Sequence, residues 1–183
     1  MKQVEDQEIL EKFNNEKTRE AGFSLLLQKY QQKIYWHVRR LVIDHDDADD
    51  IVQDTFIKVW KNLASFRNDS QLYTWIYRIA TNESITFLTK KRNKNNVSYE
   101  DINTELSEKL SDNTYFDGDK AQRKLQEAIL TLPEKQRLIF NMKYFDDLKY
   151  EEISSILGTS VGALKASYHI AVKKIELFLI AKD

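Results

Sequence analysis

Apolar residues recur at intervals of three and four along two long stretches of the chain, which is the period of a helix that buries one side. The first stretch spans residues 21–89 and the second spans residues 120–180. One Pro and four Gly among 183 residues are too few for a turn-rich all-β protein. The sequence therefore predicts an all-α fold.

The first stretch predicts three helices, at residues 21–43, 48–63 and 71–89, which we place in one domain of residues 1–92. Each helix has an apolar stripe that should face inward. The residues of the three stripes are Phe23, Leu26, Leu27, Tyr30, Ile34, Val38 and Leu41, then Val52, Phe56, Val59 and Leu63, then Leu72, Ile76, Ile79 and Ala80.

The second stretch predicts a small helical domain of residues 120–183. Pro133 suits the first turn of a helix, where its missing N–H costs nothing. Gly158 suits a left-handed helix end, and Ser160 suits the N-cap of the last helix. The expected helices are 120–131, 133–145, 150–157 and 161–180, with inward residues Leu125, Ala128, Ile129, Leu138, Ile139, Met142, Ile153, Ile156, Leu157, Val161, Leu164, Tyr168, Val172 and Ile175.

Between the two domains the periodicity fades and polar residues dominate. Residues 95–119 carry seven acids against Lys109. Such a segment cannot bury enough apolar surface to fold alone. We therefore expect residues 93–119 to form a flexible acidic linker.

Charge is segregated along the chain, although the net charge is only −1. Residues 44–54 hold six Asp and no Lys or Arg, whereas residues 72–94 hold five basic residues against Glu83. This alternation favours separate surfaces for separate partners. The absence of cysteine and of any apolar run of ~20 residues fits a cytoplasmic protein.

A short turn from Gly158 to Ser160 between two helices predicts a helix-turn-helix, whose second helix can enter the major groove of DNA. The same spacing also fits an ordinary αα-hairpin. Small and hydrogen-bonding side chains on the outward face would allow close approach to base edges and phosphates. These residues are Ser160, at the cap of the second helix, and Gly162, Ala163, Lys165, Ala166, Ser167, His169 and Lys173 along it.

Two further helix faces carry polar patterns. On helix 48–63, an acidic face interrupted by an apolar residue suits a basic helical partner, although it also fits a solvated surface. Its residues are Asp50, Gln53, Asp54, Ile57, Lys58 and Lys61. On helix 71–89, a row that offers stacking, charge and an amide suits an unpaired nucleic-acid strand. Its residues are Gln71, Trp75, Arg78 and Asn82, of which Trp75 also fits the core.

Several segments, in this order, resemble the extracytoplasmic-function (ECF) sigma factors of bacterial RNA polymerase. They are residues 44–60, 66–70 and 74–82 in the first domain, and 132–137, 150–153 and 158–165 in the second. The ending at 162–175 resembles the Bacteroidetes version of the family. The resemblance implies a transcription initiation factor that binds core RNA polymerase and promoter DNA, and commonly a membrane-anchored anti-sigma factor.

The resemblance also implies roles for residues. The polymerase surface would comprise Asp49, Asp50, Gln53, Asp54, Ile57, Lys58 and Lys61. The minus-ten element would be read and melted by Phe66, Arg67, Asn68, Asp69, Ser70, Gln71, Trp75, Arg78 and Asn82. The minus-thirty-five element would be read by the helix-turn-helix residues named above. No catalytic residue, metal, cofactor or small-molecule substrate is implied.

The sequence departs from the family pattern at four positions. Ser167 and Ile170 stand where Arg is usual in the last helix, Thr81 where Arg is common, and Lys149 where a capping Ser is common. Two rival functions remain open. One is a helix-turn-helix regulator that works without polymerase, and the other is a His-Asp metal phosphohydrolase suggested by the pair at residues 45–46.

Overall fold

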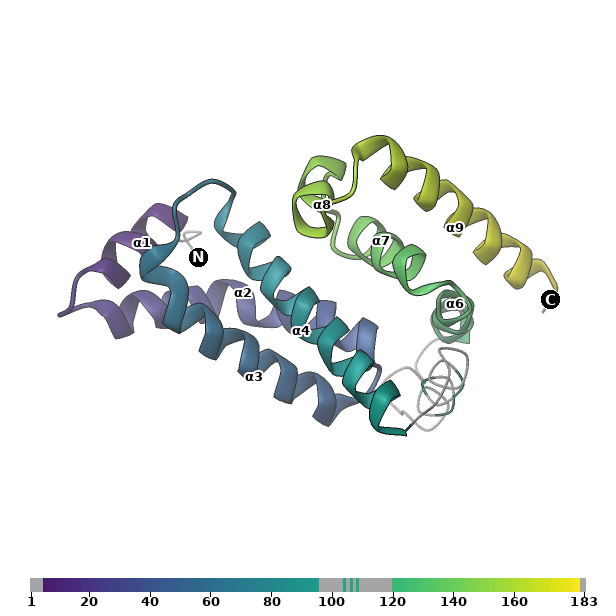
Figure 1. The fold of residues 1–183 in the computed structure, drawn as a ribbon, viewed down its shortest axis with the longest axis horizontal. Coiled ribbons are helices and arrows are strands. Elements are labelled where there is room, and N and C mark those ends of the chain that lie inside the picture. Colours follow the sequence, from purple (N-terminus) through teal and green to yellow (C-terminus); the bar gives the residue numbers. More distant parts are fainter. Residues whose placement is uncertain (1–4, 96–103, 105, 107, 109–119, 182–183) are drawn as a thin grey trace.

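A computed structural model describes residues 5–95, 104, 106, 108 and 120–181. Over the described residues the regular elements are helices, arranged in two units (Figure 1). The N-terminal unit comprises α1 (Asp6–Asn14), α2 (Arg19–Val42), α3 (His45–Asn62), a 3-10 turn η1 (Leu63–Ser65) and α4 (Leu72–Asn95). The C-terminal unit comprises α6 (Lys120–Leu130), α7 (Glu134–Tyr144), α8 (Tyr150–Leu157) and α9 (Val161–Ala181). The all-α prediction is confirmed.

The predicted helices are present with small shifts at their ends. The fourth helix of the N-terminal unit, α4, continues to Asn95, beyond the predicted end at residue 89. Pro133 is not in the first turn of α7 but directly before it, with the extended ψ of 146°. The rest of the expected linker lies outside the described residues, apart from residues 104, 106 and 108.

Helix α1 was not predicted. Ile9 and Phe13 are its buried residues, and they pack against α2. A Cβ on Gly22 would lie 2.6 Å from the backbone N of Phe13 and 3.0 Å from the carbonyl O of Ile9. The two helices therefore approach closely because residue 22 has no side chain.

The turn between α8 and α9 has the predicted geometry. Gly158 ends α8 with φ 63°, a left-handed conformation that suits glycine. The hydroxyl of Ser160 accepts a hydrogen bond from the N–H of Ala163 at 3.4 Å, which caps α9. On α9 the fully buried positions are Leu164, Ala171 and Ile175, whereas the predicted inward residues Val161, Tyr168 and Val172 are half-buried.

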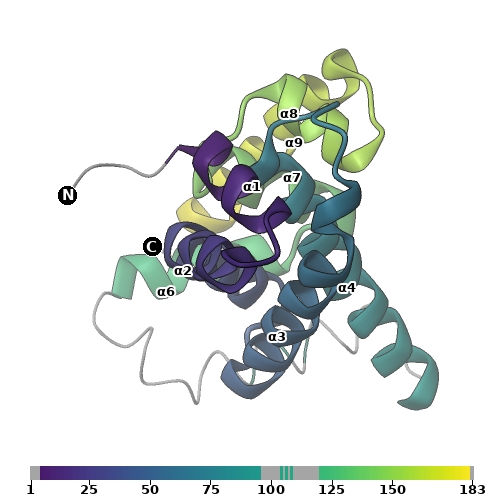
Figure 2. The same ribbon diagram turned by 90° about the vertical axis from the view of Figure 1, so that its left-hand side faces the viewer.

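The two units pack directly against each other. Helix α8 contacts α4, and α7 contacts α2 (Figures 1 and 2). Ile153 and Ile156 of α8 belong to the same buried apolar cluster as Ile76 of α4 and Val38 of α2. One buried apolar cluster therefore continues from the N-terminal unit into the C-terminal unit, and a second cluster lies within the C-terminal unit alone.

Candidate nucleic-acid interface

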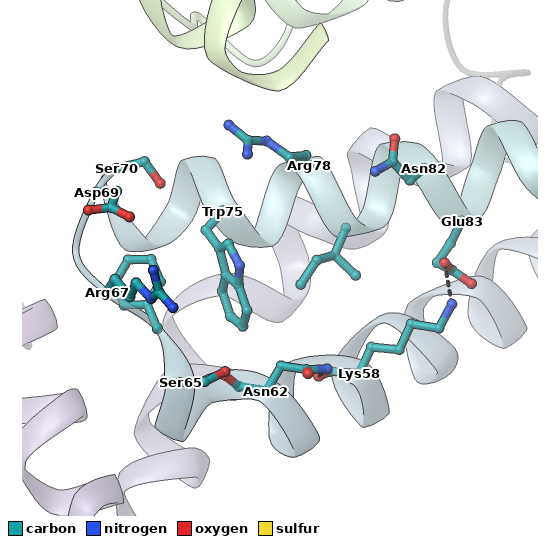
Figure 3. A pocket seen from close by; sticks show the side chains of 12 residues that line it. Lys58, Asn62, Ser65, Arg67, Asp69, Ser70, Trp75, Arg78, Asn82 and Glu83 are labelled. Carbon is teal, nitrogen blue, oxygen red and sulfur yellow. Dashed lines mark hydrogen bonds and ion pairs between the residues drawn. The ribbon is translucent and has the colours of Figure 1, made fainter. Parts of the chain in front are cut away.

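A cavity of about 500 Å³ opens between α3, α4 and the loop that joins them. It brings together most of the residues predicted to contact the minus-ten element, namely Phe66, Arg67, Asp69, Ser70, Trp75, Arg78 and Asn82 (Figure 3). Lys58, Asn62, Ser65, Ile79 and Glu83 complete its lining. The loop 66–71 and the row along α4, which follow each other in the sequence, thus form one site together with residues of α3.

The loop is shaped by local backbone geometry and by aromatic packing. Asn68 adopts φ 57°, a left-handed conformation that Asn tolerates better than most residues. The ring of Phe66 lies 5.2 Å from the ring of Trp75, at an interplanar angle of 45°. Because Trp75 is half-buried and also lines the cavity, it serves both the core and the cavity surface. Asn68 and Gln71 are exposed and lie outside the lining.

The far side of the cavity is closed by an ion pair between Lys58 of α3 and Glu83 of α4 (Figure 3). The sequence grouped Lys58 with the polymerase surface, but the structure turns its ammonium group toward this cavity. The reason is the contact with Glu83, a residue 25 positions away that helix periodicity alone does not reveal.

Arg78 is engaged by the C-terminal unit. Its Nη2 donates to the carbonyl O of Ser155 at 2.5 Å and to the Ser155 hydroxyl at 2.8 Å. In Figure 3 its guanidinium points away from Trp75, toward the C-terminal unit. Asn82, one turn further along α4, is exposed. The row on α4 is therefore open at Asn82 and contacted by α8 at Arg78.

A second, more apolar cavity of about 490 Å³ lies between α2 and α3. It is lined by Phe23, Leu27, Gln31, Asp49, Val52, Gln53, Phe56, Ile57 and Trp60, and we call it the α2–α3 groove. Three predicted polymerase-binding residues, Asp49, Gln53 and Ile57, line it. The predicted residues Asp50, Asp54 and Lys61 are exposed but do not line it.

Sequence reasoning missed Trp60 in the α2–α3 groove. Its ring packs edge-on against Phe13 at 5.2 Å and Phe23 at 4.9 Å, yet 38% of the residue stays exposed. Ile57, one turn earlier, is 44% exposed. The sequence signal for this exposed apolar surface was the spacing of three residues between Ile57 and Trp60. Both residues lie outside the buried stripe of the helix.

The helix-turn-helix presents its predicted residues to solvent. Ser160, Gly162, Ala163, Lys165, Ala166, His169 and Lys173 are exposed, and Ser167 is half-buried. Ile170, at the position where Arg is usual, is 46% exposed.

The start of α8 is capped although the usual Ser is absent there. The backbone N–H of Lys149 donates to the Glu152 carboxylate at 2.6 Å, so Glu152 caps the helix instead.

Among the residues that the structure describes, no group of three or more His, Cys, Asp or Glu side chains could hold a metal ion. His45, the residue behind the phosphohydrolase alternative, contacts Tyr35 at 2.8 Å and Asp49 at 3.5 Å. His37 is fully buried, and its Nδ1 lies 2.8 Å from Oδ2 of Asp146. Among the helices described, none is long and apolar enough to cross a membrane.

Helices make up the regular elements of the described residues, and α8 and α9 form a helix-turn-helix, as in helical DNA-binding proteins. Comparison with protein families narrows this class. Residues 26–94 match Sigma-70 region 2, and residues 122–175 match Sigma-70 region 4. The chain belongs to the sigma-70 family of RNA polymerase sigma factors, and its relatives place it in the ECF group.

Its relatives extend over nearly the whole chain. RNA polymerase sigma-H factor of Pseudomonas aeruginosa is 30% identical, over 95% of this chain and 93% of the relative. ECF RNA polymerase sigma-E factor of Escherichia coli is 31% identical, over 95% and 94%. Among solved structures, CnrH in complex with the cytosolic domain of CnrY has TM-score 0.72, 20% identity, and coverage of 97% and 99%. The sigma factor RpoE bound to the anti-sigma factor NepR from Bartonella quintana has TM-score 0.68, 21% identity, and coverage of 88% and 98%.

Proposed function

We propose that this protein binds core RNA polymerase, directs it to specific promoters and helps to open the DNA. The observation that carries the proposal is the presence of both sigma-70 regions, in order, in a chain that is similar to sigma factors over 95% of its length. In this scheme residues 1–92 form the unit that binds polymerase and the minus-ten element. Residues 120–183 form the unit that reads the minus-thirty-five element, and residues 93–119 link them.

The α2–α3 groove is the proposed polymerase-binding surface. It combines exposed apolar side chains, Ile57 and Trp60, with the carboxylate of Asp49 at its edge. Asp50 and Asp54 extend the acidic surface along α3. An apolar groove with an acidic border suits a basic amphipathic helix of the partner.

The cavity beside Trp75 is the proposed site for an unpaired base of the minus-ten element. Its walls offer an aromatic ring, the guanidinium of Arg67 and the amide of Asn82. Stacking supports a base by ~1–3 kcal/mol, and an amide can read its Watson–Crick edge. A volume of about 500 Å³ accommodates one extruded base with its sugar.

The outward face of α9 is the proposed reader of the minus-thirty-five duplex. Gly162, Ala163 and Ala166 leave room for close approach, and Lys165 can reach a guanine or a phosphate. Lys173 lies further along the exposed face, where it suits a phosphate contact. With Ser167 and Ile170 in place of Arg, this face has few cations, so duplex binding should depend on polymerase.

Because the relatives named above are sigma factors, we propose that this chain is not an enzyme. We propose that it acts in the cytoplasm on polymerase and DNA. Two of the solved structures hold an anti-sigma factor or a partner's cytosolic domain. A membrane-anchored anti-sigma factor is accordingly the proposed inhibitor.

Run-off transcription with purified core polymerase on a genomic promoter library tests the function. We expect transcripts from a discrete set of promoters only when the protein is added. Tight, sequence-specific binding to duplex DNA by the protein alone, without promoter-specific transcription, would support a polymerase-independent regulator instead.

A further inference from the structure

Four aromatic rings of the C-terminal unit form a continuous array. Tyr144 and Phe140 of α7 stack with their ring centroids 5.2 Å apart, and Phe140 stacks with Tyr168 of α9 at 5.7 Å. Tyr168 in turn contacts Tyr150, the first residue of α8, edge-on at 6.4 Å. The array therefore connects α7, α9 and α8, which lie together in Figure 1, and it ends at Tyr150.

The middle of the array is fixed by burial. Phe140 belongs to the apolar cluster of the C-terminal unit, and Tyr168 packs against both this cluster and the one shared with the N-terminal unit. Tyr150 is half-buried and packs against the shared cluster. Its ring is therefore held by the protein while part of the residue remains accessible to solvent.

Two lysine ammonium groups lie at the ring of Tyr150. The Nζ of Lys165 on α9 is 5.7 Å from the ring centroid, and the Nζ of Lys143 on α7 is 5.5 Å from it. Both distances are within the range of about 6 Å in which a ring attracts a cation. Lys143 also donates to the carbonyl O of Leu148 at 3.2 Å and lies 3.8 Å from a carboxylate oxygen of Asp147. In the part of the chain that the structure describes, the contact of the Lys165 ammonium is the ring itself.

This contact prepares Lys165 for binding. An exposed lysine samples many rotamers, and ordering it on DNA costs conformational entropy. A ring that already attracts the ammonium group reduces that cost. The attraction acts on the charge, so the three N–H donors stay available for a guanine or a phosphate. Because Ser167 and Ile170 stand where Arg is usual, the orientation of Lys165 matters more on this face.

We propose that Tyr150 is a positioning residue, whose ring orients the ammonium group of Lys165 toward the minus-thirty-five duplex. The proposal rests on the proposed function of the outward face of α9. Lys165 makes the contact with DNA, and Tyr150 acts through Lys165. A cation–aromatic contact at an exposed site changes an equilibrium constant by about 2- to 5-fold, which sets the size of the expected effect.

The contact can be measured in the free full-length protein, without polymerase or DNA. Reductive methylation with isotope-labelled formaldehyde places methyl groups on lysine Nζ and keeps the charge. We expect the Lys165 signal, assigned by its loss in Lys165→Arg, to be shifted upfield by the ring in the wild type and in Tyr150→Phe. In Tyr150→Leu it should move to the position of an exposed lysine such as Lys173. A Lys165 signal that is the same in Tyr150→Phe and Tyr150→Leu would overturn the proposal.

The consequence for DNA is measured with the holoenzyme. The probe is a fluorescein-labelled duplex that carries the minus-thirty-five element of a promoter from the run-off set and lacks the minus-ten element. Tyr150→Phe keeps the ring and should bind as the wild type does. A trifluorinated phenylalanine at position 150 keeps the ring shape but removes electron density from its face, so affinity should fall about 2- to 5-fold. Tyr150→Leu should lose at least as much.

The same replacements in a Lys165→Ala background separate positioning from packing. Without Lys165 they should cause no further loss, whereas an equal loss in both backgrounds overturns the proposal. Melting temperatures show which variants are folded, and the fluorinated residue carries the test if Tyr150→Leu is not. If Lys165→Ala binds the duplex as the wild type does, the proposed role of Lys165 fails, and the role of Tyr150 fails with it. A loss in Lys165→Ala without a loss on fluorination overturns the role of Tyr150 alone.

Discussion

Replacement of Ile57 by Ala tests whether the α2–α3 groove holds the polymerase. Ile57 keeps 44% of its surface exposed in the free protein, and a partner in the groove would cover that surface. Full burial of an Ile side chain is worth about 1.5–3 kcal/mol, so covering the exposed fraction is worth about 0.7–1.3 kcal/mol. At 1.4 kcal/mol per factor of ten, Ile57→Ala should weaken binding about 3- to 9-fold.

The assay is a titration of fluorescently labelled protein with core polymerase in the absence of DNA. Ile170→Ala is a matched control, because Ile170 is the same residue type, is 46% exposed and lies on α9. We expect its dissociation constant to equal that of the wild type. Equal losses in the two variants, or wild-type affinity in Ile57→Ala, would refute the assignment of polymerase binding to this groove.

Three other predictions concern the remaining surfaces and the fold. Exchange of both Asp50 and Asp54 for Lys should weaken polymerase binding while the melting temperature stays unchanged, because both residues are exposed; wild-type affinity would contradict the acidic surface. In permanganate footprinting, Asn82→Ala should impair strand opening, whereas Lys165→Ala should cost about 1–3 kcal/mol in minus-thirty-five binding; normal melting by Asn82→Ala would remove Asn82 from the site. Gly22→Ala should lower stability by about 1–3 kcal/mol in urea unfolding, because the new Cβ meets the Phe13 backbone at 2.6 Å; an unchanged unfolding midpoint would show that α1 moves at no cost.

Helix periodicity was sufficient to locate the long helices, because each buries a continuous apolar stripe. It did not reveal α1, whose buried residues are only Ile9 and Phe13. Two apolar residues four apart are a weak signal, and the packing of α1 depends on Gly22, a residue of the next helix. Contacts between elements, rather than local propensity, account for this part of the fold.

The candidate sites, like the fold, could be predicted only in part from the sequence. The row Trp75, Arg78 and Asn82 follows from helix spacing, and the structure places all three around one cavity. The contact between Arg78 and Ser155 does not follow from spacing, since 77 positions separate the two residues. The Bacteroidetes-like character of the C-terminal sequence stays a prediction.

The small number of charges on the exposed face of α9 limits how tightly the free protein can bind duplex DNA. The exposed face carries Lys165 and Lys173 among the predicted contacts, so binding of duplex DNA through this face, as proposed, would neutralise about two phosphates. Such binding would have a log–log salt dependence of about −2, which is weak beside that of typical specific DNA-binding proteins. Tight recognition then requires both DNA contacts at once, linked through polymerase.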